Sequence, residues 1–98
     1  MTSKQRAYLR SLASTKNAIF QVGKNEISEN MCIQIANALE AHELVKISVL
    51  ENCGYTAREA ADILAQGTES EVVTVIGRKI ILYKESEKHK KIFLETIK

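Results

Sequence analysis

The amino-acid sequence predicts an α/β fold, a mixed four-stranded sheet with helices packed on it, in the order α-β-α-β-α-β-β. Segments with a helical spacing of apolar residues alternate with short runs rich in Val and Ile. Two helical segments begin with a capping box, Thr2 with Gln5 and Thr56 with Glu59. The two-residue Gly77-Arg78 connection between the last two runs is typical of a type II′ antiparallel hairpin.

The composition fits one small domain with its own hydrophobic core. The chain has 98 residues, of which 45% are hydrophobic and 27% are charged, and it has no proline. Cys32 and Cys53 are far apart and lack zinc-type spacing, so we expect reduced thiols, no metal or other cofactor, and a cytoplasmic protein. The sequence also predicts no membrane span and no signal peptide.

The first helix is predicted over Ser3 to Ala13, with an apolar side that includes Tyr8 and Leu9. Arg6 and Arg10 are one turn apart and point away from that side. Both guanidinium groups are therefore expected to be free for solvent or for a phosphate.

The stretch from Ile19 to Ser28 is the one around which the other elements are organised. A short strand over Ile19 to Val22 runs into a tight turn, Gly23-Lys24-Asn25-Glu26, and Ser28 caps a helix from Glu29 to about His42. A helix N-terminus behind a glycine turn presents unpaired N–H groups, which suit a phosphate. The alternative is a plain solvated turn, because a single Gly-Lys pair is common.

The second half of the chain predicts a strand over Leu44 to Leu50, a helix after Thr56 that ends at Gly67, and a hairpin made by 71–76 and 79–83. The two strand–helix–strand units predict parallel neighbouring strands. The hairpin strands are apolar on both faces, so we expect the first helix or the C-terminal segment to cover the second face. That segment is charged, and it is expected to fold back through Ile92-Phe93-Leu94.

Four motifs stand in a characteristic order and spacing. They are Thr2-Ser-Lys-Gln-Arg-Ala-Tyr-Leu-Arg10, Phe20-Gln-Val-Gly-Lys24, Ala38-Leu-Glu-Ala41 followed by Glu43-Leu-Val-Lys46, and Val75-Ile-Gly-Arg-Lys-Ile-Ile-Leu-Tyr83. In these motifs the chain resembles the YhbY family, the single-domain bacterial members of the CRM domain (chloroplast RNA splicing and ribosome maturation).

The resemblance implies an RNA-binding domain over residues 1–84, related in fold to the C-terminal domain of bacterial translation initiation factor three, with 85–98 as a tail. It also implies association with precursors of the large ribosomal subunit and their rRNA. In the family, the turn after the first strand is a GxxG loop, analogous to the loop with which KH domains clamp a nucleic-acid backbone. Gly23 and Lys24 match this loop, but Glu26 stands in place of its second glycine. Either the loop binds more weakly, or Asn25 takes the left-handed conformation instead.

The candidate RNA-binding residues come from separate segments that only the fold brings together. The net charge of +2 is small, so the placement of the cations matters more than their number. Tyr8 and Tyr83 are able to stack on bases, but their apolar context favours the core, and Cys32 and His42 are also interpreted as structural. The candidates are Arg6, Arg10, Lys16, Gly23, Lys24, Asn25, Arg78 and Lys79.

Three classes of function are weighed. The leading hypothesis is a monomeric, non-enzymatic RNA-binding protein of large-subunit assembly, with no membrane contact and no small-molecule substrate. The alternative is a ribosome-associated adaptor that binds protein through a sheet edge or the tail. An enzyme is disfavoured because the sequence has neither a nucleophile with a partner His nor a phosphate-loop signature.

Overall fold

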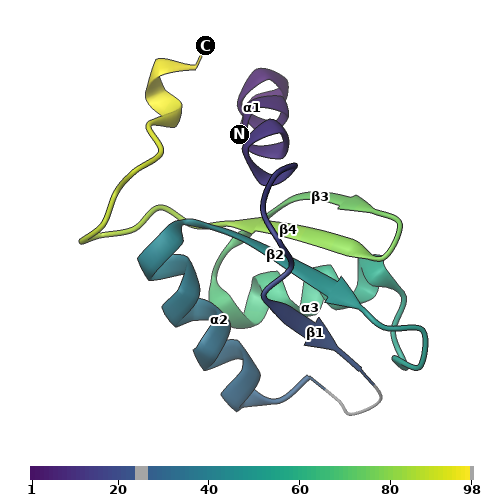
Figure 1. Cartoon of the computed structure of the whole chain (residues 1–98). Helices are drawn as coiled ribbons and strands as arrows, with labels where there is room; N and C mark the ends of the chain where they lie inside the picture. Colours follow the sequence, from purple (N-terminus) through teal and green to yellow (C-terminus); the bar gives the residue numbers. More distant parts are fainter. Residues whose placement is uncertain (24–26, 98) are drawn as a thin grey trace.

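The computed structural model describes residues 1–23 and 27–97 and has the predicted order of elements. One mixed sheet has α2 and α3 on one face and α1 on the other (Figure 1). The predicted turn over Lys24, Asn25 and Glu26 lies outside the described residues. The elements are α1 (Ser3–Ala13), β1 (Phe20–Val22), α2 (Glu29–His42), β2 (Leu44–Val49), α3 (Ala57–Thr68), β3 (Glu71–Ile76), β4 (Lys79–Tyr83) and a 3-10 turn, η1 (Leu94–Thr96).

Local sequence signals determine where the helices and the hairpin turn begin. Thr2 and Thr56 form the two predicted capping boxes, and the Ser28 side chain caps α2. Gly77 has a φ of 58°, whereas Arg78 does not have a positive φ. A positive φ at the first turn position alone is the type II′ conformation, as predicted.

The strand order is β1-β2-β4-β3, with β4 between β2 and β3. β1 and β2 are parallel, as predicted, but the second predicted parallel pair is wrong, because β2 pairs with β4 and not with β3. β4 takes the central place because its residues from Ile80 to Tyr83 are apolar and buried. β3 lies at the edge, where Glu71 and Ile76 are exposed.

The main core lies between the sheet and the pair α2 and α3, which pack closely at Gly67. The prediction that α3 ends at Gly67 is wrong, because the helix continues through Thr68 and Glu69 caps it in a left-handed conformation. Gly67 instead allows α2 to approach, since a Cβ at this position would lie 2.7 Å from the Cys32 Sγ atom. Cys32 is half-buried in this contact, in agreement with a structural role.

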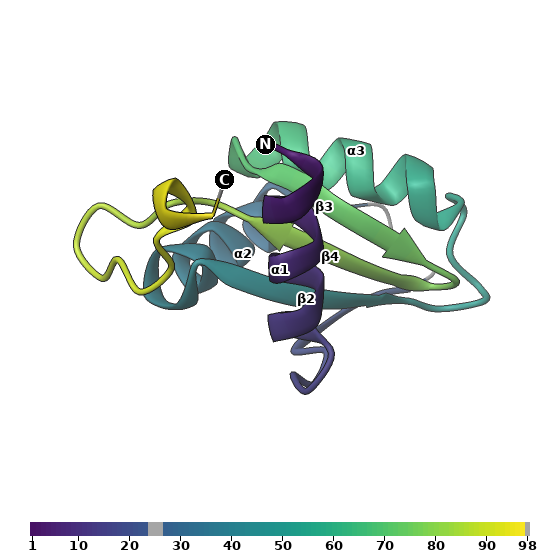
Figure 2. The ribbon, with the colours of Figure 1, turned by 90° about the horizontal axis from the view of Figure 1, so that it is seen from above.

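A second core covers the opposite face of the sheet, where α1 and the segment after β4 lie over the strands (Figure 2). Leu9 of α1 and Ile92 of the tail pack in one cluster with Ile81 and Tyr83 of β4. Tyr83 is therefore a core residue, as predicted. Tyr8 is not, because its position on α1 leaves it 39% exposed.

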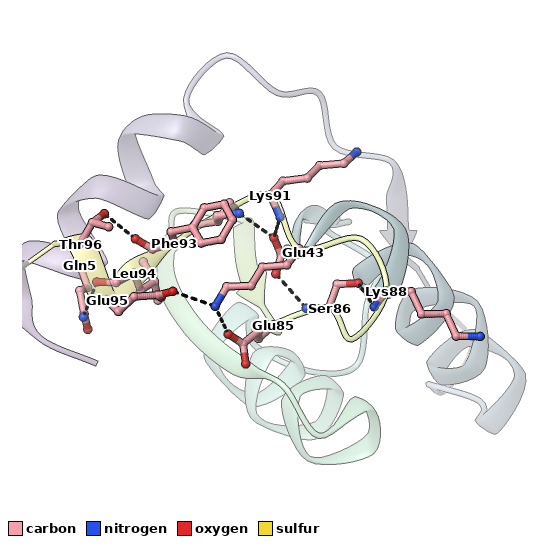
Figure 3. Close-up of polar contacts among 12 residues, drawn as sticks. Gln5, Glu43, Glu85, Ser86, Lys88, Lys91, Phe93, Leu94, Glu95 and Thr96 are labelled. Atoms are coloured by element: carbon pink, nitrogen blue, oxygen red, sulfur yellow. Dashed lines mark hydrogen bonds and ion pairs between the residues drawn. The ribbon is translucent and has the colours of Figure 1, made fainter.

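Glu43 ties the tail to the end of α2. It caps α2 with a φ of 65°, and its side chain is fully buried. The carboxylate accepts backbone N–H groups from Ser86 and Ile92, both at 2.8 Å, and from Lys91 (Figure 3). Three charge-assisted hydrogen bonds compensate for the burial of this charge. The sequence pattern gave no sign of this role, because the donors are backbone groups more than forty residues away.

Replacing Glu43 by Gln is expected to lower the free energy of unfolding by about 1–3 kcal/mol, because an amide oxygen cannot satisfy all three donors. Urea denaturation measures this loss, and hydrogen exchange should become faster at the amides of residues 86, 91 and 92. Glu69→Gln makes the same change at the other left-handed helix cap, where the side chain is exposed. Equal losses in the two variants would contradict the role of Glu43.

Burial and the neighbouring carboxylates of Glu43 and Glu85 raise the pKa of Tyr83 from 10.0 to about 12. Between pH 10 and about 12 the unfolded chain loses this proton while the folded chain keeps it, so stability falls as the pH rises. The expected loss is at most about 3 kcal/mol. Unfolding experiments against pH should show this loss relative to Tyr83→Phe, and a constant difference between the two proteins would exclude it.

Candidate nucleic-acid interface

α1 covers only part of its face of the sheet and leaves the end nearest the β3–β4 hairpin uncovered (Figure 2). The strand register places four residues in one row across this end, which we call the bare row: Gln21, Ser48, Lys79 and Ile76. Their neighbours along the strands, such as Ile80, face the main core, so alternation directs the row to the uncovered face. The Lys79 ammonium donates to the Ser48 hydroxyl at 2.8 Å across this face.

Two further cations border the bare row. Lys46 lies two residues before Ser48 on β2, and its ammonium donates to the carbonyl oxygen of Lys16 at 3.4 Å. Arg10 is an exposed residue of α1. Because Leu9 faces the sheet and the Gln5 side chain donates to tail carbonyls, Arg10 lies on the side of α1 that faces the row.

Arg6 is committed to the structure, so the prediction that its guanidinium is free is wrong. It donates to the carbonyl oxygens of Val72 and Val73, both at 2.6 Å. These carbonyls lie at a β-bulge between Val72 and Thr74, where the pairing of β3 with β4 is interrupted. Arg6 therefore supports the edge strand. The side chain of Arg10 is exposed and forms no hydrogen bond or ion pair with another described residue.

The hairpin tip and the end of β1 lie at the same end of the sheet as the bare row. The Val49 N–H group donates to the Arg78 carbonyl at 2.7 Å, and the Arg78 guanidinium reaches the Leu50 carbonyl at 3.5 Å. A Cβ at Gly23 would lie 3.5 Å from the Leu50 side chain. Leu50 therefore lies between Gly23 and Arg78, and both border the uncovered face.

The predicted candidates thus separate into three groups. Arg10, Gly23, Arg78 and Lys79 lie around the uncovered face, and Lys16 lies beside Lys46 at its margin. Arg6 is engaged by β3, while Lys24 and Asn25 lie outside the described residues. Sequence reasoning missed Lys46, although its alternation with Val45 and Ile47 signals a side chain on the outer face of β2.

The chemistry of the uncovered face is that of anion binding. Its ammonium, guanidinium, hydroxyl and amide groups all donate hydrogen bonds, and none of the four residues of the bare row is acidic. In the described ranges, 1–23 and 27–97, no cluster of His, Cys, Asp and Glu is arranged to hold a metal ion. Within the same ranges no helix has the length and apolarity needed to cross a membrane.

The family model of the CRS1/YhbY (CRM) domain matches residues 1–84. Bacillus subtilis YqeI, named a probable RNA-binding protein, is 49% identical over 94 residues, which are 96% of this chain and 98% of that protein. A Haemophilus influenzae protein named an RNA-binding protein is 31% identical over 90 residues, 92% of this chain and 91% of its own. A Staphylococcus aureus protein solved in solution has a TM-score of 0.78 at 47% identity, with 95% and 97% coverage, which confirms the fold. The chain therefore belongs to the CRS1/YhbY (CRM) domain family.

Proposed function

We propose that this chain binds RNA through the uncovered end of its sheet and acts, without catalysis, on precursors of the large ribosomal subunit. Two relatives are named RNA-binding proteins, which supports RNA as the partner. The resemblance to the YhbY family supports large-subunit precursor rRNA as the RNA. The free cysteines Cys32 and Cys53 support the cytoplasm as the place of action. The proposed interface comprises the bare row together with Arg10, Lys46, Arg78 and Gly23.

This proposal depends on one observation: the Lys and Arg side chains on the uncovered face of the sheet have only uncharged hydrogen-bond partners. Lys79 bonds a hydroxyl and Lys46 bonds a carbonyl oxygen. Across the described residues, the ion pairs use other cations, Arg58 and Lys90. Unneutralised Lys and Arg side chains on one surface are the requirement for contacts to a phosphate backbone, and Gln21 and Ser48 add donors for phosphate or sugar oxygens.

The adaptor alternative has less support at two of the surfaces it would use, which are Ile92 in the tail and the edge of β3. Ile92, in the apolar part of the tail, is 7% exposed and packs in the second core. The β3 edge carries a bulge and is bonded by Arg6, and both features oppose the addition of a further strand. Because the β3 edge is blocked, we propose that the chain does not pair with a second copy through it and acts as a monomer.

Lys79→Gln and Arg10→Gln are each expected to weaken binding to fragments of large-subunit rRNA. Each variant should also reduce the slope of log affinity against log salt by about one, because one phosphate contact is lost. Titrations of the full chain over a range of KCl concentrations measure both quantities.

Lys88→Gln is the matched control, since Lys88 is an exposed residue of the tail and is not part of the proposed interface. It should leave the slope unchanged. Equal changes in all three variants would contradict the proposed interface. Absence of salt-dependent binding by the unmodified chain would contradict RNA binding itself and favour the adaptor.

A further inference from the structure

A two-part groove continues from the uncovered face around the end of α1. Its first hollow, of about 380 Å³, lies beside the connector between α1 and β1 and is lined by Lys16, His42 and Lys46 among others. Its second hollow, of about 340 Å³, is lined by Tyr8 of α1 and Lys91 of the tail as well as by Lys16 and His42. The shared residues join the two hollows into one path. Each hollow has the volume of a small-ligand pocket, about 300–1,000 Å³.

The groove carries positive charge, and none of the residues that line its two hollows is acidic. Lys16 and Lys46 contribute to the first hollow, and Lys91 contributes to the second. Glu43 follows His42 in the chain, but its carboxylate is buried and bonded to backbone amides of the tail. Figure 3 shows the Lys91 side chain directed away from that carboxylate. An anionic ligand therefore meets cations here without a facing carboxylate.

Tyr8 adds an aromatic ring to this basic groove. Tyr8 is 39% exposed, whereas Leu9 and Ala13 of the same helix are fully buried. A positively charged groove with an accessible aromatic side chain is the arrangement that binds single-stranded nucleic acid, because bases stack on the ring while the cations contact the backbone.

We propose that the groove binds unpaired nucleotides of the RNA, with Tyr8 stacked on a base and with Lys16 and Lys46 at the adjacent phosphates. This inference rests on the RNA binding proposed above and adds a preference for single strands, because a base held inside a duplex does not reach the ring. Lys46 borders both the uncovered face and the first hollow. A bound strand therefore passes from the bare row into the groove.

The test compares Tyr8→Ala with Tyr8→Phe in the full chain, using fluorescence anisotropy with labelled oligouridylate, oligoadenylate and a blunt RNA duplex. Tyr8→Ala should weaken binding of the single strands about 5- to 150-fold, which is the range for one lost base stack. Duplex binding should not change, and Tyr8→Phe should match the unmodified protein because it keeps the ring. Circular dichroism confirms that each variant is folded.

Photocrosslinking of the unmodified protein to oligomers that contain 4-thiouridine gives a second readout without any substitution. The crosslinked peptide should contain Tyr8. If single strands bind Tyr8→Ala as tightly as the unmodified protein while Lys79→Gln weakens binding, the groove is not the site and RNA binding stands. An equal loss for single strands and duplex in Tyr8→Ala would also overturn base stacking. Failure of the unmodified protein to bind any RNA would overturn the proposed function.

Discussion

The two apolar faces of β4 determine how the rest of the molecule is arranged. Ile80 and Leu82 pack in the main core with α2 and α3, whereas Ile81 and Tyr83 pack in the second core with α1 and the tail. Both faces of the strand must be removed from water, so β4 lies inside the sheet and both faces need a cover. A single helix that crosses the strands covers a band only about 10 Å wide. Lys79, the polar first residue of β4, lies beyond the part of the sheet that α1 covers. This end of the sheet is therefore accessible to a ligand.

Capping residues, turns and apolar periodicity predicted the helices, the hairpin and the element order, because these signals act between residues a few positions apart. Thr2, Thr56 and Gly77 are examples, and each has the predicted conformation. The position of β4 was not predicted, because strand order depends on which of several apolar strands is covered on both faces. Gly67 was misinterpreted for a related reason: its role depends on Cys32 of another helix.

The residues of the candidate site differ in the same way: the placement of some follows from the nearby sequence, and the placement of others depends on distant segments. Strand alternation and helical spacing place Lys79 and Arg10 outward without knowledge of the fold. The engagement of Arg6 depends on a bulge 66 residues away in β3, and the hollow beside Tyr8 depends on the path of the tail, because Lys91 and Ile92 help to line it. Neither cause leaves a pattern near the residue in the sequence.

The attachment of the tail through Glu43 has a consequence for how such chains can diverge. The carboxylate recognises N–H groups, which every residue except proline carries, so it does not select the side chains of the tail. Positions 87–89 are exposed and make no contribution to the buried cluster of Ile92. The family model ends at residue 84, yet the residue that anchors the tail lies inside it. A tail with different exposed side chains can therefore be attached to this domain in the same way, provided that the three N–H donors are kept.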